Sequence, residues 1–284
     1  IYKLEAGSRI LVKNGALRVD RYWDLSFNIQ KKFDHKEASS RILELLKESV
    51  RKRLISDVPL GVFLSGGIDS SAVVSQMAEL MDPKDIKTFS IGFKERSFDE
   101  SSDARRVAEY FGTDHHEEIL SPGGMLDVFP KVLDVLDEPF ADSSIIPTYL
   151  VSKFTRGHVK VALGGDGGDE LFLGYPSFLA HKLDGYLGLI PASLKKLPLK
   201  LLLKCVKPSN DYMSLYFKAK RFSRGLDFPE EVRHQAWIGS FTPDEQKALL
   251  ISGRDSSLRT DIYGITEKYF KNAKPARYKA EPMR

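Results

Sequence analysis

The sequence predicts an α/β fold: a mainly parallel sheet with helices on both faces, followed by a helix-rich C-terminal part. From residue 58 onward, short apolar segments typical of strands alternate with segments whose apolar residues recur at helical spacing. The chain has 284 residues, 42% of them hydrophobic, which is enough to bury a full core. Beyond about residue 175 the patterns become helical. Because ligands of such sheets bind at the carboxyl ends of the strands, functional motifs are expected there.

The N-terminal region predicts a β-hairpin and then a helix. Residues 4–19 contain two short strand-like segments joined by Asn14 and Gly15, which both tolerate positive φ. A lone hairpin is barely stable, so we expect it to complete the sheet of a preceding domain. Asp34, with Glu37 three residues later, is typical of a helix start. The apolar face of that helix is expected to carry Ile42, Leu45, Leu46 and Val50.

The alternating region predicts four strands and four helices. The strands are expected at residues 58–64, 86–93, 115–120 and 158–163. The helices are expected at about 69–81, 123–136 and 144–156, together with one that carries Ala104, Val107, Ala108 and Phe111. Further along, Thr242, Pro243 and Glu245 predict an N-cap, a proline at the first helical position and a capping glutamate.

Composition narrows the class of protein. There are 43 basic and 39 acidic residues, mixed along the chain, so we expect an ordinary solvated surface and no nucleic-acid partner. Cys205 is the single cysteine, which excludes an internal disulfide and a thiolate metal cage and favours a reducing, cytoplasmic setting. No apolar stretch approaches the roughly 20 residues that span a bilayer. The chain opens without Met or a leader, so we expect a fragment of a longer protein.

The segment from Ser65 to Ser71, SGGIDSS, lies between an apolar strand and an amphipathic helix. Its two glycines let a ligand approach the backbone, and the start of the following helix attracts phosphate. Asp69 would repel phosphate directly, so its natural task is to hold a Mg²⁺ that bridges phosphate oxygens. A Walker loop is excluded because Gly67 stands where a lysine is needed. The alternative is a purely structural strand-to-helix turn.

A second acidic loop, Gly164 to Glu170, follows the strand-like HVKVAL segment. The carboxyl ends of parallel strands share one edge, so both loops are expected to face one ligand. Taken alone, this loop could also be a surface turn or a Ca²⁺ site, and its pairing with the first loop argues against both alternatives.

Several ordered motifs resemble the asparagine synthetase branch of the N-type ATP pyrophosphatases. They are DVPLGVFLSGGIDSS, TFSIGF, FDESSDARRVAEYFGTDHHE, LDEPFADSS and VALGGDGGDELFLGY, which together cover about residues 57–175. The resemblance implies an adenine nucleotide alpha-hydrolase-like fold. The chain departs from the usual family pattern at Gly164, where relatives have Ser, and at Leu173, where they have Gly. Relatives also carry Glu at the position of Asp166.

The resemblance also implies the roles of individual residues. Mg²⁺ would be held by Asp69 and Asp169, and Asp166 would lie near the reacting carboxylate or amine as the candidate catalytic residue. The residues expected to bind ATP are Phe63, Leu64, Ser65, Gly66, Gly67, Asp69, Ser70, Ser71, Ile91, Gly164 and Gly165.

The resemblance implies an ATP-dependent amide-forming ligase of the asparagine synthase (glutamine-hydrolysing) type. It would adenylate a carboxylate, expected to be the side chain of aspartate, and ammonia would then displace AMP. The implied domains are 1–27, the tail of a glutaminase domain that supplies ammonia, and 28–284, a synthetase domain truncated before a lysine-bearing helical region. A homodimer is allowed for. The alternatives are an amidotransferase acting on a carboxylated sugar or other acceptor, and a non-catalytic ATP-binding module. The presence of Asp69 and Asp169 argues against the module.

Three other features receive a structural interpretation first. His115 and His116 are adjacent on a strand and so point to opposite faces, which favours packing or hydrogen bonding over a metal pair. Glu138 and Asp142 precede a helix and are candidate caps, with substrate contact as the alternative. Cys205 is expected on an amphipathic helix, with nothing to activate it.

Overall fold

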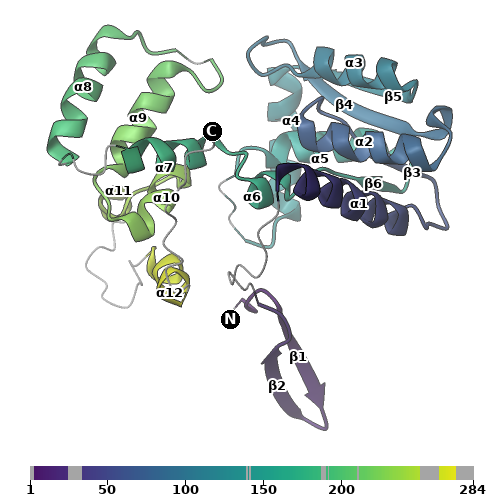
Figure 1. Cartoon of the computed structure of the whole chain (residues 1–284), viewed down its shortest axis with the longest axis horizontal. Helices are drawn as coiled ribbons and strands as arrows, with labels where there is room; N and C mark the ends of the chain where they lie inside the picture. The colour runs from purple at the N-terminus through teal and green to yellow at the C-terminus, as the bar shows by residue number, and fades with distance from the viewer. Residues whose placement is uncertain are drawn as a thin grey trace.

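A four-stranded parallel sheet organises the first half of the chain. The computed structural model describes residues 3–24, 34–138, 140, 142–186, 190, 192–209, 211–249 and 262–272. The strands lie in the order β5-β4-β3-β6, all parallel (Figure 1). Their bounds are Leu60–Phe63 for β3, Lys87–Phe93 for β4, Asp114–Leu120 for β5 and Val161–Leu163 for β6. The predicted parallel sheet is confirmed.

Helices cover both faces of this sheet, as predicted. Alternate side chains of β4 point to opposite faces. Thr88 points to the side of α3 (Ser101–Phe111), where its hydroxyl bonds His115 at 2.8 Å. Phe89 points the other way, and its ring meets Phe154 of α5 (Ile145–Arg156) edge-on at 6.1 Å. Beside these helices lie α1 (His35–Arg53), α2 (Ile68–Leu80), the short 3-10 helix Pro83–Asp85 and α4 (Pro122–Val135).

The hydrophobic core lies between β3, β4 and the helices α1 to α3. Its fully buried members come from β3, from α2 and from residues that flank the strands: Val62, Leu64, Val74, Met77 and Ile86. Burying a side chain of this size stabilises the fold by about 1.5–3 kcal/mol. The segment just before the first acidic loop and the helix just after it are therefore fixed by apolar packing.

Strands β3 and β6 are shorter than predicted. We expected residues 58–64 and 158–163, whereas the ladder between them begins with Leu60 beside Val161. The reason lies in Pro59, which has no N–H to donate. The Pro59 carbonyl instead accepts from the backbone N–H groups of Lys160 at 3.0 Å and Val161 at 3.4 Å. These bonds join the two segments just before the ladder starts.

The predicted helix starts are confirmed. The Asp34 side chain accepts from the backbone N–H of Glu37 at 2.7 Å and begins α1. Further along, Thr242 and Glu245 bond reciprocally at the start of α11 (Pro243–Leu249), with Thr242 N–H donating to Glu245 Oε2 at 2.7 Å. On α1, Val50 is buried and Leu46 packs against the core, while Ile42 and Leu45 are 41% and 47% exposed.

From Gly168 onward the described elements are all helices, and in Figure 1 most of them lie to the left of the sheet. Its helices are α6 (Gly168–Phe172), α7 (Pro176–Tyr186), α8 (Ala192–Cys205), α9 (Leu215–Gly225), α10 (Glu230–Ile238), α11 and α12 (Gly264–Asn272). A buried carboxylate ties three of them together, because Asp184 of α7 pairs with Lys195 of α8 at 2.7 Å and with Arg233 of α10. Cys205 is exposed at the end of α8, on a helix as expected.

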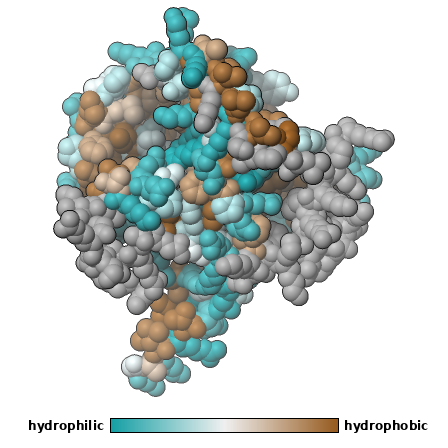
Figure 2. All heavy atoms as spheres, turned by 90° about the vertical axis from the view of Figure 1, so that its left-hand side faces the viewer, coloured by the Kyte–Doolittle hydropathy of each residue, from teal (hydrophilic) through white to brown (hydrophobic). Residues whose placement is uncertain are grey.

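The predicted N-terminal hairpin is present and projects away from both halves (Figure 1). Strands β1 (Ser8–Lys13) and β2 (Ala16–Arg21) pair antiparallel around Asn14 and Gly15, whose φ angles are 52° and 77°. Apolar side chains gather on this hairpin (Figure 2), including Val12 and Leu17, which are 67% and 66% exposed. Among the described residues, no helix combines the length and apolar character needed to cross a bilayer.

Candidate active site

The two acidic loops meet at the carboxyl edge of the sheet because β3 and β6 are neighbours. A cavity of about 330 Å³ opens between them. It is lined by Phe63, Ser65, Asp69, Ser70, Gly164, Gly165, Asp166, Gly167, Asp169, Glu170 and Tyr175. The sequence expectation that both loops face one space is thus met in geometry, and Asp69, Asp166 and Asp169 all line that space.

The first loop is held closed by its own serines. Ser70 Oγ lies 3.1 Å from Ser65 Oγ and accepts from Ser65 N–H at 3.2 Å, while Ser65 Oγ accepts from Gly67 N–H at 3.2 Å. Gly67 is the N-cap of α2, and no described side chain caps this helix. The first N–H groups of α2 therefore lack a side-chain partner beside the cavity, which is the arrangement that binds phosphate groups.

Gly66 fixes the direction of the first loop. Its φ of +82° is strained for any residue with a side chain, and a Cβ there would lie 2.5 Å from the backbone of Asp103 and Ala104. The loop is consequently in backbone contact with the first turn of α3.

The second loop fits against the first through glycines. A Cβ on Gly165 would lie 2.8 Å from Ser70 N and 2.9 Å from the carbonyl carbon of Asp69. A Cβ on Gly168 would lie 2.5 Å from Asp69 Oδ2. Real Cβ atoms do not approach so closely, so glycine at both positions allows the carboxylates of the two loops to share one cavity.

The cavity is strongly anionic. Burial raises the pKa of Asp69, and the nearby carboxylates of Asp169 and Glu170 raise it further. The described lining contains four carboxylates and no lysine or arginine. A bound cation would relieve this repulsion.

The donor set fits a Mg²⁺ shared with a nucleotide. Mg²⁺ is usually held by one or two carboxylates together with substrate phosphates. Asp69 and Asp169 are the carboxylates that could fill this role, because both line the cavity, and Gly165 and Gly168 let the second loop approach Asp69 closely. Among the described residues, no three His, Cys, Asp or Glu side chains converge as a ready-made metal cage.

Some predicted ATP-binding residues lie outside the cavity lining. They are Leu64, Gly66, Gly67, Ser71 and Ile91. Leu64 is buried and its N–H donates to the Phe89 carbonyl at 2.8 Å, while the hydroxyl of Ser71 is buried. Their predicted roles thus stay predictions. Sequence reasoning gave no role to Glu170 and Tyr175, although both stand in the VALGGDGGDELFLGY segment.

The two family departures have clear structural settings. Leu173 follows α6 in the left-handed conformation, with φ 59° and ψ 39°, where glycine is favoured. At Gly164, a Cβ would lie 2.6 Å from Asp166 Oδ2, so the missing side chain gives that carboxylate room to fold back over the loop.

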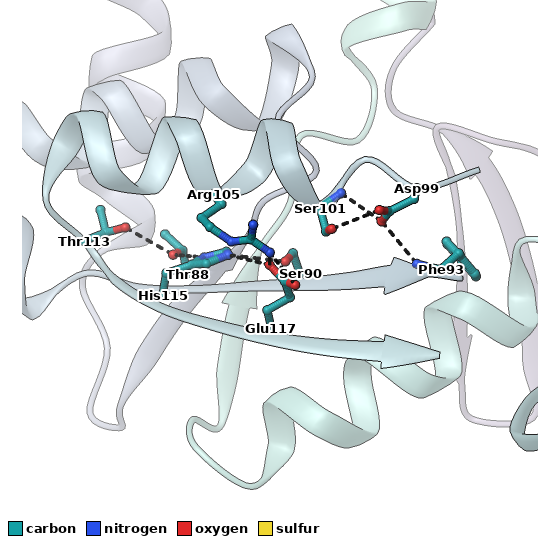
Figure 3. Close-up of polar contacts among 9 residues, drawn as sticks. All are labelled: Thr88, Ser90, Phe93, Asp99, Ser101, Arg105, Thr113, His115 and Glu117. Atoms are coloured by element: carbon teal, nitrogen blue, oxygen red, sulfur yellow. Dashed lines mark hydrogen bonds and ion pairs between the residues drawn. The ribbon is translucent and has the colours of Figure 1, made fainter. Parts of the chain in front are cut away.

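The two histidines pack on opposite faces of β5, as predicted. Figure 3 shows His115 among polar side chains beneath α3, where its ring nitrogens lie 2.8 Å from Thr88 Oγ1 and 3.4 Å from Ser90 Oγ. Burial lowers the pKa of His115. His116 stacks on Phe89 with 5.2 Å between ring centroids. Neither histidine lines the cavity between the acidic loops.

The two candidate caps differ. Asp142 accepts from Ser144 N–H at 2.9 Å in an Asx turn before α5, but Ser144 is the N-cap of that helix and no side-chain hydrogen bond caps it, so Asp142 is not the predicted cap. Glu138 instead pairs with Lys3, next to the hairpin.

The sheet and its paired loops define an α/β protein with an anionic cavity at the carboxyl edge of a parallel sheet, beside the start of α2. The family model for asparagine synthase matches residues 41–261, so the chain belongs to the asparagine synthase family.

Curated relatives and one solved structure are similar to this chain. It is 36% identical over 199 residues to asparagine synthetase (glutamine-hydrolyzing) 1 of Bacillus subtilis, covering 69% of this chain and 31% of that protein. It is 38% identical over 233 residues to a Methanocaldococcus jannaschii protein provisionally named asparagine synthetase (glutamine-hydrolyzing) 2, covering 81% and 44%. The chain thus spans less than half the length of these relatives. A structure of NH3-dependent NAD synthetase from Campylobacter jejuni is 19% identical over 70% of this chain and 99% of its own, with a TM-score of 0.34.

Proposed function

We propose that the protein is an ATP-dependent ligase that adenylates a carboxylate, namely the side chain of aspartate. Ammonia then displaces AMP from the acyl-adenylate. The observation that carries this proposal is the cavity in which Asp69 and Asp169 meet across a glycine cradle beside the uncapped start of α2. Such a site suits the triphosphate of a nucleotide bound with a divalent cation. Membership of the asparagine synthase family supports the type of reaction.

The first step joins two anions. A carboxylate oxygen attacks the α-phosphorus of ATP, and the bond from that phosphorus to pyrophosphate breaks. Mg²⁺, when bound, neutralises charge that builds on the departing pyrophosphate. The chain's own part is to hold the phosphates with the backbone N–H groups at the start of α2 and to carry the cation on Asp69 and Asp169.

The second step forms the amide. Ammonia attacks the acyl carbon of the acyl-adenylate, AMP leaves with the bonding electrons, and the nitrogen gives up a proton. Asp166 lines the cavity as a carboxylate without a metal role, and we assign it to accept this proton or to hold the attacking nitrogen. In the longer relatives ammonia would come from a glutaminase domain, and that arrangement is part of the proposal.

The test is a carboxylate screen on the full-length protein. Pyrophosphate release is measured with ATP, Mg²⁺ and ammonia while aspartate, other amino acids and a uronic acid are offered in turn. We expect release with aspartate, matched by an equal amount of asparagine. Release with the uronic acid alone would support the sugar amidotransferase, and ATP binding without any release would support the non-catalytic module.

Variants separate the two steps. Asp69→Asn should reduce pyrophosphate release, while Asp57→Asn, at an exposed position before β3, should leave it unchanged. Asp166→Asn should keep aspartate-dependent exchange of pyrophosphate into ATP but lose amide formation. Loss of both reactions in Asp166→Asn would show that Asp166 acts before ammonia arrives.

A further inference from the structure

A sharp turn after α6 brings the chain back over the carboxylates of the second loop. Leu173 ends α6 in the left-handed conformation. Gly174 then donates its N–H to the Asp169 carbonyl at 3.0 Å, and a Cβ there would lie 3.0 Å from Cγ of Asp169. One residue later, Tyr175 Oη donates to Glu170 Oε1 at 2.7 Å. The turn therefore touches Asp169 with one residue and Glu170 with the next.

The ring of Tyr175 is supported from the helix-rich part. It stacks on Phe178 of α7 with 6.3 Å between centroids and 28° between planes. Phe178 in turn stacks on His234 of α10 at 5.2 Å, and His234 lies 3.1 Å from His181, nitrogen to nitrogen. Stacked rings of this kind restrict the orientation of each member. Tyr175 thus reaches the cavity from a fixed support and not from a free loop.

Glu170 is the carboxylate that needs restraint. It follows Asp169 directly in the chain and lines the same cavity, yet Asp69, Asp169 and Glu170 do not converge as a three-carboxylate metal site among the described residues. The hydroxyl of Tyr175 is a proton donor at neutral pH, because an ordinary tyrosine has a pKa of about 10, and the hydrogen bond to Glu170 raises the pKa of Tyr175 to about 12.

We propose that Tyr175 is a positioning residue: its hydroxyl holds Glu170 at the rim of the cavity, so that Asp69 and Asp169 alone face the cation carried by the nucleotide. This inference rests on the proposed function, because it takes the ligand to be ATP bound with a divalent cation. Without the hydroxyl, Glu170 is free to turn inward. There it would occupy a coordination position that a phosphate oxygen should fill and would repel the triphosphate.

The expected signature separates this role from a merely structural one. In Tyr175→Phe, affinity for Mg-ATP should fall by about tenfold, an effect of the size that outer-shell hydrogen bonds around a metal site typically have. Affinity for Mn²⁺ alone should not fall, since a third carboxylate adds a ligand for a bare cation. A variant that merely loosened the cavity would lose both affinities.

The experiment is a double-mutant cycle read by calorimetry for Mg-ATP and by electron paramagnetic resonance for Mn²⁺. Glu170→Gln keeps an oxygen for the tyrosine hydroxyl but removes the charge, so adding Tyr175→Phe to it should change Mg-ATP affinity by less than about twofold. Tyr186→Phe, an exposed tyrosine on α7, is the matched control and should behave as wild type.

Each result decides the inference. It is supported if Tyr175→Phe weakens Mg-ATP alone and the loss disappears with Glu170→Gln. It is overturned if Tyr175→Phe binds Mg-ATP like wild type, if Mn²⁺ affinity falls in parallel, or if the loss is the same in both backgrounds. Wild-type protein that binds no Mg-ATP would overturn the proposed function as well. Mg-ATP binding without carboxylate-dependent pyrophosphate release would overturn only the proposed reaction. The result of the double-mutant cycle would still be valid.

Discussion

The two acidic loops of the cavity are built in different ways. The first stands between buried Leu64 and the buried helix residues Val73 and Val74, with Gly66 against the backbone of α3. The second follows the three-residue strand β6 and enters α6, none of whose five residues is buried. The hydrophobic core thus positions one loop. The other takes its position from the first loop, through glycine contacts, and from hydrogen bonds of the turn that follows it.

The glycine contacts should carry the largest effect. In Gly165→Ala the new Cβ would meet Ser70 N and the Asp69 backbone, atoms that cannot move without shifting the first loop. A displacement of about 1 Å costs on the order of 10²-fold where geometry decides, so we expect Mg-ATP affinity to fall by about that factor. Calorimetry measures it. Gly123→Ala in α4, where a Cβ meets nothing within 4 Å, is the control, and similar affinities for both variants would contradict the described fit.

Asp69→Asn tests the charge that the two loops share. We expect Mg-ATP affinity to fall at least about tenfold, because one of two proposed carboxylate ligands is lost. Equal affinities of variant and wild type in calorimetry with Mg²⁺ would remove Asp69 from the cation site.

The same variant should be more stable than wild type at neutral pH. Burial and neighbouring carboxylates raise the Asp69 pKa in the folded protein, so its ionisation destabilises the fold. Below the unfolded-state pKa of about 3.9 this penalty is absent, and it grows as pH rises through the raised folded pKa. The gain in unfolding midpoint in urea should therefore be present at pH 7 and shrink in acid. An equal gain at both pH values would contradict this origin.

Asp99 anchors the helix against which the first loop rests. Its carboxylate accepts from Phe93 N–H at 3.2 Å and from Ser101 N–H at 3.1 Å (Figure 3). Asp99→Ala should lower the free energy of unfolding by about 1–2 kcal/mol, the usual cost of losing a helix-start acceptor. Asp134→Ala, an exposed site in α4, is the control for urea unfolding. Equal unfolding midpoints of the two variants would show that Asp99 is not an anchor.

The pH dependence of this contribution has the opposite sign to that of Asp69. Burial opposes ionisation of Asp99, but the hydrogen bonds from Ser101 and Phe93 outweigh it and lower the pKa. The stabilisation is therefore complete above the unfolded pKa of about 3.9 and is lost as pH falls through the lower folded value. The difference between wild type and Asp99→Ala should accordingly narrow in acid.

Leu173→Gly should give the smallest effect on stability, and it should raise the free energy of unfolding. A left-handed residue other than glycine costs roughly 1–2 kcal/mol, while glycine gives back part of that through a more flexible unfolded chain. We expect a net gain of about 0.5–1 kcal/mol in the free energy of unfolding, read from urea titrations. A loss instead would mean that the half-exposed Leu173 side chain supports the turn more than its backbone strains it.

The contrast between the loops also explains what the sequence could predict. The first loop was recognisable because its features are local: an apolar strand, two glycines, a carboxylate and an amphipathic helix. The order of the strands in the sheet and the roles of Gly168 and Tyr175 could not be predicted from the sequence, because they depend on contacts between distant segments. The left-handed turn at Leu173 could not be predicted locally, since a leucine gives no signal for positive φ. The rings that support Tyr175 come from α7 and α10, and their pairing is a matter of tertiary packing.

The neighbouring places of β3 and β6 have a consequence for how the protein forms. Leu60 pairs with Val161, so almost the whole α/β part must be synthesised before the two loops can meet. Closing so long a stretch of chain costs entropy before any contact rewards it, which makes such pairings late events in folding. The turn at Ser65 can form early with β3 and α2. The carboxylates of the two loops come together only when β6 docks, so a nascent chain has its first loop well before the proposed cation site is complete.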